Sequence, residues 1–203
     1  IVEWGIREKC DAIVLAPNHI RLTAPVLEKA RNHGIQIVLI DSKMDAGHHA
    51  CIVESDNTKA GLQAADYLAG LIQNTGRVIL ARHMKKHAST SERAMGFSQR
   101  VSNAYPGIKI VADPYLGDSK GFAYRSVIEL LAQFPQTDAI FCVGEEASMG
   151  ILKALGETDR NRKIRFVGFD LNPEIRAALI GGQMDATIVQ DPYQIGYTGV
   201  WAA

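Results

Sequence analysis

The stretch RFVGFDLNPEIRAALIGGQMDATIVQD, residues 165–191, carries the pattern that decides the fold. It opens with an apolar run that ends at Asp170, and a second apolar, β-branched run covers 186–191. Between them, apolar residues recur three and four apart over 173–180. Such runs predict buried strands, and this spacing predicts a helix. A strand, a helix and a strand in this order form a βαβ unit with two parallel strands.

The same alternation extends along the whole chain. About eight strands are predicted from short apolar runs, many ending in a polar residue: 11–16, 35–41, 50–56, 77–82, 108–116, 138–144, 165–170 and 186–191. Helices are predicted between them from the helical spacing of apolar residues: 25–32, 59–73, 92–103, 121–133, 146–155 and 173–180. The sequence therefore predicts an α/β protein with parallel sheets flanked by helices.

Proline and glycine residues agree with several of these helix ends. Pro25 and Pro173 are expected in first helical turns, where the missing N–H of proline is tolerated. Gly34 and Gly156 are expected at the C-terminal caps of two helices.

Composition limits the classes of partner. The chain has 203 residues, of which 47% are hydrophobic, so it can bury a core as one domain or as two small lobes. Lys+Arg and Asp+Glu both number 22, and the formal net charge is zero. No long-range field favours a nucleic acid or a membrane surface, and the expected ligand is a small molecule.

The sequence gives no sign of a cofactor, a metal or a catalytic motif. It has no GxSxG elbow, no GxxxxGK[ST] loop and no GxGxxG after a strand, so we expect no cofactor and no enzyme activity. His83 and His87 have helical metal-ligand spacing, but two lysines between them repel cations. Cys10, Cys51 and Cys142 form no CxxC pair and are expected to be buried as small hydrophobic residues.

Polar residues at strand ends are the candidate ligand contacts. In open α/β sheets, ligands bind beyond the carboxyl ends of the strands, which selects Asp41, Asp170, Gln190 and the turn 144–146. A carboxylate accepts two hydroxyl hydrogens, and charge-assisted bonds of this kind are roughly twice as strong as neutral ones. The set predicts a hydroxyl-rich ligand. The alternative is that each aspartate caps the helix that follows it.

Glu145 and Glu146 are adjacent carboxylates at the start of a predicted helix. Adjacent residues on a helix diverge by about 100°, so these two carboxylates cannot form a facing acid and base pair. One of them is a candidate cap of the helix, and the other a candidate for the ligand cleft.

Seven segments in a fixed order resemble one known family. They are DAIVLAPN (11–18), GIQIVLIDS (34–42), ESDNTKAGLQAADYLA (54–69), SERAMGF (91–97), FPQTDAIFCVGEEASMGILKAL (134–155), VGFDLNPEIRAAL (167–179) and GGQMDATIVQDPYQIGYTGV (181–200). Together they resemble the periplasmic sugar-binding proteins of the ribose-binding type, and the related effector domains of lactose-repressor-type regulators.

The resemblance implies the type I periplasmic binding protein fold, in which two Rossmann-like lobes joined by a hinge close over a ligand. The first lobe would comprise 1–55 and 191–203, and the second lobe 56–190. Hinge crossings are expected near 55–57 and 190–192. The family's opening strand and helix have no counterpart here, so we expect the first lobe to be truncated at its N-terminus.

The resemblance also implies the ligand contacts. The implied residues are Asp41 and Ser42 from the first lobe, Arg93, Gly144, Glu145, Glu146 and Asp170 from the second, and Gln190 from the hinge. Arg93 would reach a ring oxygen or a hydroxyl of the ligand. The alternative for this residue is an arginine on a helix surface.

Three positions depart from the family's pentose binders, which carry an arginine at Ser42, an asparagine at Gly144 and an aromatic residue at 117–118. These changes remove hydrogen-bond donors and a stacking face for a sugar ring. We therefore expect a polyol, a modified sugar or another small polar compound rather than ribose. A carboxylate at Glu145 or Glu146 would tolerate a cationic group.

The function implied is that of a periplasmic, extracytoplasmic solute-binding protein that delivers a sugar or polyol to the membrane permease of an ABC-type importer. The alternative is the ligand-sensing domain of a cytoplasmic lactose-repressor-type regulator, or of a membrane sensor or chemoreceptor. No nucleic acid is expected to bind this segment. A signal peptide ahead of the chain would indicate transport, and a helix-turn-helix would indicate a regulator.

Overall fold

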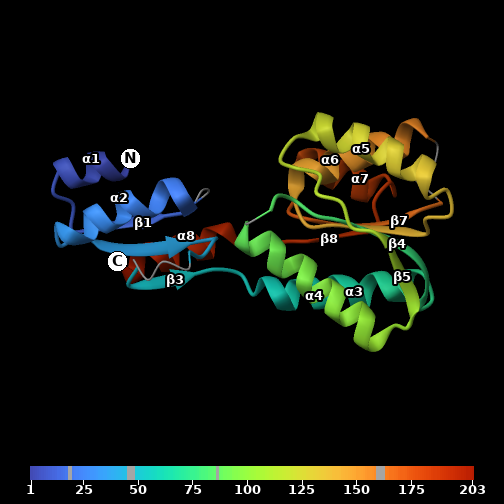
Figure 1. Cartoon of the computed structure of the whole chain (residues 1–203), viewed down its shortest axis with the longest axis horizontal. Coiled ribbons are helices and arrows are strands. Elements are labelled where there is room, and N and C mark those ends of the chain that lie inside the picture. The colour runs from blue at the N-terminus through green and yellow to red at the C-terminus, as the bar shows by residue number, and fades with distance from the viewer. Residues whose placement is uncertain (18–19, 45–48, 86, 159–162) are drawn as a thin grey trace. The chain divides into compact units, whose positions relative to one another are not determined.

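The computed structural model describes residues 1–203 except 18–19, 45–48, 86 and 159–162. Helices and strands alternate along these residues (Figure 1). The helices are α1 (Val2–Arg7), α2 (Ile20–Asn32), α3 (Asn57–Leu71), α4 (Ala88–Ala104), α5 (Lys120–Gln133), α6 (Glu145–Glu157), α7 (Pro173–Ile180) and α8 (Pro192–Ala202). The strands are β1 (Ala12–Leu15), β2 (Gln36–Ile40), β3 (Cys51–Val53), β4 (Thr75–Ala81), β5 (Gly107–Ala112), β6 (Ala139–Cys142), β7 (Arg165–Phe169) and β8 (Ala186–Ile188).

Two parallel sheets are formed by these strands. One has the order β1-β2-β3, and the other has the order β5-β4-β6-β7-β8. The pairing of neighbouring strands is parallel in both sheets. The predicted fold class, parallel sheets flanked by helices, is therefore confirmed.

The chain divides into two compact units. Unit 1 comprises Ile1–Asp56, His87–Ser89 and Gln190–Ala203, and unit 2 comprises Asn57–Lys86 and Thr90–Val189. The sequence assigned residues 56–190 to the second lobe. Within that range, the division places Asp56, His87–Ser89 and Gln190 in unit 1. By this division, the chain passes from one unit to the other after Asp56, on both sides of His87–Ser89 and before Gln190.

Unit 1 is a layered structure. Ile37 and Leu39 of β2 pack with Leu27 of α2 in one apolar cluster. On α8, a side chain added at Gly199 would overlap Ile40, so this helix lies directly on the sheet. Successive side chains of a strand point to opposite faces. The sheet therefore lies between α1 and α2 on one face and α8 on the other.

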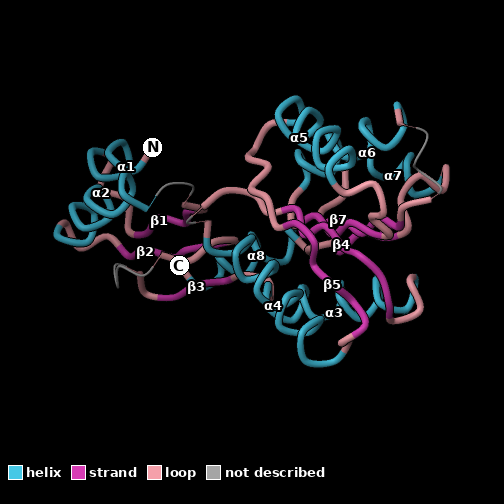
Figure 2. Tube along the Cα trace, turned by 45° about the vertical axis from the view of Figure 1, so that its right-hand side comes forward, coloured by secondary structure: helices cyan, strands magenta, loops and turns pink. Residues whose placement is uncertain are grey.

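Unit 2 has helices on both faces of its sheet, as Figures 1 and 2 show. Ile79 and Ile140 pack in a cluster that includes residues of α5, α6 and α7. Leu80, Phe141 and Phe169 pack in a second cluster with α3 and α4. Because both faces are covered, these strands are apolar throughout and lack the alternation of a half-exposed sheet.

Helices α3 and α4 cross with their backbones in contact. A Cβ at Gly61 of α3 would overlap the carbonyl oxygen of Arg93, and one at Gly96 of α4 would overlap that of Thr58. Glycine at these two positions therefore sets how closely α4 approaches α3. This contact fixes the position of Arg93, which α4 carries.

The helix ends correct two expectations. Pro25 lies inside α2, which begins earlier at Ile20, so its missing N–H leaves one helical hydrogen bond unmade. Gly156 lies inside α6, whose C-cap is Thr158. The other two expectations are confirmed: Gly34 follows α2 with φ +81°, and Pro173 begins α7.

Among the helices that the structure describes, none combines the length and the apolar character needed to cross a membrane.

Candidate ligand-binding site

The carboxyl edge of the unit 2 sheet brings together residues that are far apart in the sequence. In the parallel pairing of β6 with β7, Phe141 lies opposite Val167. Continued three residues further, this register sets Gly144 beside Asp170. The residues that follow these two strands are therefore neighbours at one edge of the sheet, as the rule for open α/β sheets requires.

Arg93 is buried at this edge, with 3% of its surface exposed. Its Nε donates to Oδ1 of Asn57 at 2.8 Å, and its Nη1 donates to the carbonyl oxygen of Val143 at 3.0 Å. Its Cζ lies 3.6 Å from the centroid of the Phe169 ring. A buried guanidinium needs such partners to offset its lost hydration. The alternative of a surface arginine is wrong.

Asp170 faces this guanidinium. Its Oδ2 lies 3.8 Å from Nη1 of Arg93, and 26% of its side chain is exposed. The backbone is fixed on both sides, because the Asp170 N–H donates to Ile188 and the Asp170 carbonyl accepts from Oγ1 of Thr187, both at 2.8 Å. A ligand can reach this carboxylate, whose position the protein has already set.

The capping alternative for Asp170 is also resolved. The N-cap of α7 is Asn172, whose Oδ1 accepts from the backbone N–H of Ile175 at 2.8 Å. The Nδ2 of the same side chain donates to Oε1 of Glu145 at 2.7 Å. Asn172 thus caps its helix and holds Glu145 at the start of α6.

The turn before α6 has an open N-cap. Gly144 is the N-cap residue and has no side chain to cap the helix. Its carbonyl accepts from Oγ of Ser148 at 2.8 Å and from Sγ of Cys142 at 3.4 Å. Glu146 is exposed, whereas Glu145 is partly buried.

Asp41 of unit 1 repeats the backbone arrangement of Asp170. Both aspartates follow a strand directly, and both have φ +67°. The N–H of Asp41 donates to Val53 at 2.9 Å, as that of Asp170 does to Ile188. Left-handed conformations are uncommon for residues other than glycine and concentrate at functional sites. This shared conformation supports a common role for the two aspartates.

Ser42 and Gln190 lie in unit 1. Ser42 is 5% exposed, and its Oγ lies 3.3 Å from Oγ of Ser89 at the start of α4. Gln190 is partly buried, and its Oε1 accepts from Oγ of Ser55 at 2.9 Å. The burial of Ser42 favours an internal contact of this hydroxyl over a direct ligand contact, whereas Asp41 beside it is partly exposed.

Of the eight residues predicted from the sequence, the structure gathers Arg93, Gly144, Glu145 and Asp170 in unit 2. Sequence reasoning missed Asn57, Asn172 and Phe169, which hold Arg93 and Glu145 in place. Their signal is weak, because each stands at an ordinary helix start or strand end.

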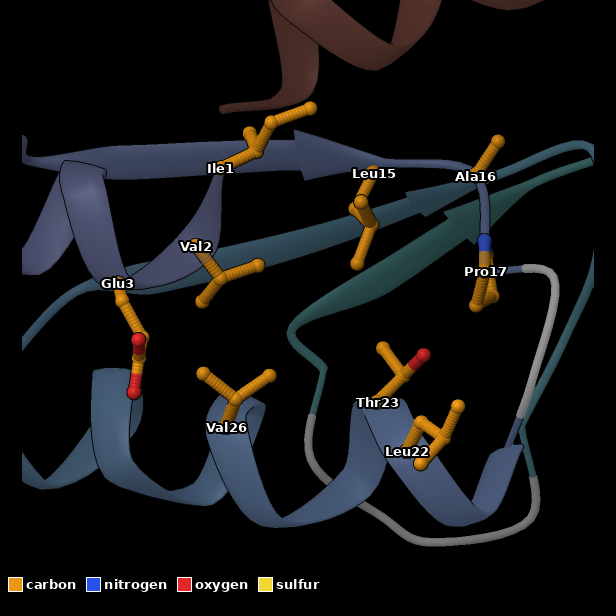
Figure 3. A pocket seen from close by; sticks show the side chains of 9 residues that line it. All are labelled: Ile1, Val2, Glu3, Leu15, Ala16, Pro17, Leu22, Thr23 and Val26. Carbon is orange, nitrogen blue, oxygen red and sulfur yellow. The ribbon is translucent and has the colours of Figure 1, made fainter.

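A separate pocket opens in unit 1 between α1, the end of β1 and α2, with a volume of about 490 Å³. Figure 3 shows that Val2, Leu15 and Val26 point into it. Glu3 and Thr23 are the polar side chains of its lining. Orienting a hydroxyl-rich ligand takes several convergent polar groups, so we place no ligand in this pocket.

Cys142 lies beneath the Gly144 turn. Burial raises the pKa of its thiol to about 11. Its burial confirms the expectation from the sequence, whereas Cys10 and Cys51 are only partly buried, so that expectation is wrong for them.

We expect iodoacetamide at pH 8 to alkylate Cys10 and Cys51 in the native protein and Cys142 only after denaturation. With a pKa about three units above this pH, only about one Cys142 thiol in a thousand is a thiolate, which is the reactive form. Mass spectrometry of labelled peptides measures each site. A Cys10→Ser/Cys51→Ser variant serves as the control and should take up almost no label before unfolding. Rapid labelling of Cys142 in the native protein would contradict this account.

The site offers carboxylate acceptors for polar hydrogens. The partly exposed carboxylate of Asp170 can accept hydrogen bonds, and Glu145 adds a second carboxylate, whose Oε1 accepts from Asn172. Within the described part of the chain, no group of three His, Cys, Asp or Glu side chains is placed to hold a metal ion. Fold and site together define a parallel α/β protein that carries a buried arginine and a partly exposed carboxylate at the carboxyl edge of one sheet.

Comparison with known proteins identifies the family. The model of the periplasmic binding protein domain matches residues 1–203, so the chain belongs to this family, as its sequence segments indicated. It is 26% identical over 202 residues to the ribose import binding protein of Bacillus subtilis (strain 168), covering 100% of this chain and 65% of that protein. It is 29% identical over 197 residues to the D-allose-binding periplasmic protein of Escherichia coli (strain K12), covering 93% and 63%. The chain thus spans less than two thirds of the length of these curated relatives.

A solved structure agrees with this assignment. The carbohydrate transporter solute-binding protein from Agrobacterium radiobacter, in complex with D-arabinose, superposes with a TM-score of 0.91 at 28% identity. The match covers 99% of this chain and 70% of that one.

Proposed function

We propose that this chain is the ligand-binding body of a solute-binding protein that serves an ABC-type importer and takes a sugar or polyol. One observation carries the proposal: the partly exposed carboxylate of Asp170 is held against the buried guanidinium of Arg93 at the carboxyl edge of a parallel sheet. A fixed acceptor beside a fixed cation can bind the hydroxyl groups of a neutral ligand without further ordering of side chains.

The relatives support the ligand class. Two are described as ribose import and D-allose-binding proteins, and a third was solved with D-arabinose. All three ligands are sugars rich in hydroxyl groups. The carboxylates of Asp170 and Glu145 can accept the hydrogen bonds that such groups donate.

Asp41 is proposed as a second ligand contact. It shares the left-handed conformation of Asp170 and follows its strand in the same way. Aspartate tolerates this conformation better than most residues, so each strand can end in a carboxylate held by backbone hydrogen bonds.

Transport is the function that the relatives favour over regulation. The relatives described above are import and periplasmic binding proteins, and none of them is described as a transcriptional regulator. We therefore propose that the protein acts outside the cytoplasm, passes its ligand to a membrane permease and catalyses no reaction.

A thermal-shift screen against sugars, polyols and small amines tests the proposal. A ligand at 100 times its dissociation constant stabilises a protein by about 2.7 kcal/mol, which is a shift of several degrees. We expect a shift with at least one sugar or polyol. Folded protein that shows no shift with any of them would contradict the proposed function, and a shift with amines alone would change the ligand class.

A further inference from the structure

Building on the proposed function, we infer that a recess at Gly144, bordered by His83, takes a substituent that extends beyond the ring or chain gripped by Asp170 and Arg93. A ligand with one more hydroxymethyl group than a pentose would fill this recess. The pair Gly144 and His83 would then determine specificity for the larger ligand.

Packing does not require a glycine at position 144. The backbone there has φ −157° and ψ 160°, which any residue adopts. Gly144 is buried, yet a Cβ built on it would meet only the Cδ2 atom of His83, at 3.9 Å, within 4 Å of its surroundings. At Gly61, by contrast, a Cβ would overlap backbone atoms. The missing side chain at Gly144 therefore leaves room beside a buried turn.

Strand register places this recess next to the proposed ligand contacts. Ala81 of β4 lies opposite Cys142 of β6, and two residues further this register sets His83 beside Gly144. Continued three residues past its last pair, the register of β6 with β7 sets Gly144 beside Asp170, and Nη1 of Arg93 lies near both Val143 and Asp170. Neighbouring strands lie about 4.8 Å apart, so the row from His83 to Asp170 spans about 10 Å.

The chemistry of the row changes along its length. At one end of the row lies the carboxylate of Asp170, the proposed acceptor of ligand hydroxyls. In the middle, Arg93 donates a hydrogen bond to the carbonyl of Val143, the residue before Gly144. At the other end, His83 is partly buried, and the Cδ2 edge of its imidazole ring borders the recess. The recess between them carries no side chain of its own, which suits a short group such as CH₂OH.

Matched pairs of probes test this inference. Binding is measured by calorimetry for D-ribose with D-allose, D-xylose with D-glucose, L-arabinose with D-galactose, and xylitol with sorbitol; within each pair the second member is larger by one carbon and its hydroxyl. We expect the wild-type protein to favour the larger member of the pair it binds. Gly144→Val fills the recess and should lower that preference by at least about tenfold. His83→Ala should lower it severalfold.

Two further variants separate the site from general effects. Gly144→Ala adds a single methyl group at ordinary contact distance from His83, so it tests the recess if the valine variant melts early. Gly70→Ala is the matched control, because Gly70 also has no atom near its Cβ position but lies on α3, away from the row. It should leave the preference unchanged.

The outcomes distinguish the two proposals. If the wild-type protein binds a probe but the Gly144 and His83 variants keep its size preference, or if it favours the smaller member throughout, the recess has no role in specificity. The proposed function would then still stand. If no probe binds to the folded protein, the proposed function fails, and this inference fails with it.

Discussion

Replacing Asp170 with alanine should weaken ligand binding by about 2 kcal/mol or more, which is about a thirtyfold rise in the dissociation constant. The carboxylate is 26% exposed and lies 3.8 Å from the Arg93 guanidinium, so we propose that it accepts ligand hydroxyls from a position that the protein has already fixed. Titration calorimetry with the ligand found in the screen measures the effect.

The companion variant Asp170→Asn separates the effect of losing the charge from the effect of disturbing the backbone. Asparagine tolerates the left-handed conformation at φ +67°, so it removes the charge with little change in the backbone. We expect it to lose most of the affinity that alanine loses, with a melting temperature near that of the wild type. Asp11→Ala, at an exposed aspartate of unit 1, is the control. Wild-type affinity in both Asp170 variants would reject this residue as a ligand contact.

Replacing Arg93 with methionine should abolish measurable binding and also lower the free energy of unfolding by about 3 kcal/mol. Methionine keeps much of the length but donates no hydrogen bond. It removes the donor that Arg93 supplies to Oδ1 of Asn57 and to the carbonyl of Val143, and it removes the cation 3.8 Å from Asp170. Urea unfolding measures the stability, and calorimetry the affinity.

Two further variants serve as controls for Arg93→Met, one at the same position and one at an exposed arginine. Arg93→Lys keeps the charge but loses the planar fork, so it should recover only part of the stability and little of the binding. Arg176→Met, at an exposed arginine of α7, should change stability by less than about 0.5 kcal/mol. An Arg93→Met protein as stable as the wild type would show that the buried network around the guanidinium contributes nothing.

Together these variants distinguish two roles within one ion pair. Asp170 is partly exposed and is the proposed ligand contact, so its replacement should affect binding more than folding. Arg93 is buried among Asn57, Val143 and Phe169, so its replacement should affect both. A reversal of this order would place the ligand against Arg93 and leave Asp170 as its counter-ion.

Much of the fold could be predicted from local pattern. The apolar runs at 138–144 and 165–170 each became a strand because a strand covered on both faces needs apolar side chains throughout. The helix boundaries were less predictable. Pro25 lies inside α2 and Gly156 inside α6, because packing along a whole helix outweighs the preference of one residue for an end.

The candidate site was predictable in part. Asp41 and Asp170 each stand directly after an apolar run, so the place of each one at the carboxyl end of a strand in its own sheet follows from the order of residues. The burial of Arg93 did not follow, because SERAMGF (91–97) does not show what α4 faces. Its partners come from positions 57, 143 and 169, which only folding brings together.

By itself, the sequence determined the α/β class, the family and the two strand-end aspartates, because these depend on periodicity and on the order of residues along the chain. The tertiary structure alone decided that Arg93 is buried, that Asn172 rather than Asp170 caps α7, and that Gly144 stands beside His83 with room for a side chain. These features depend on strand register and on the close approach of α3 and α4, which are set by packing between segments far apart in the chain.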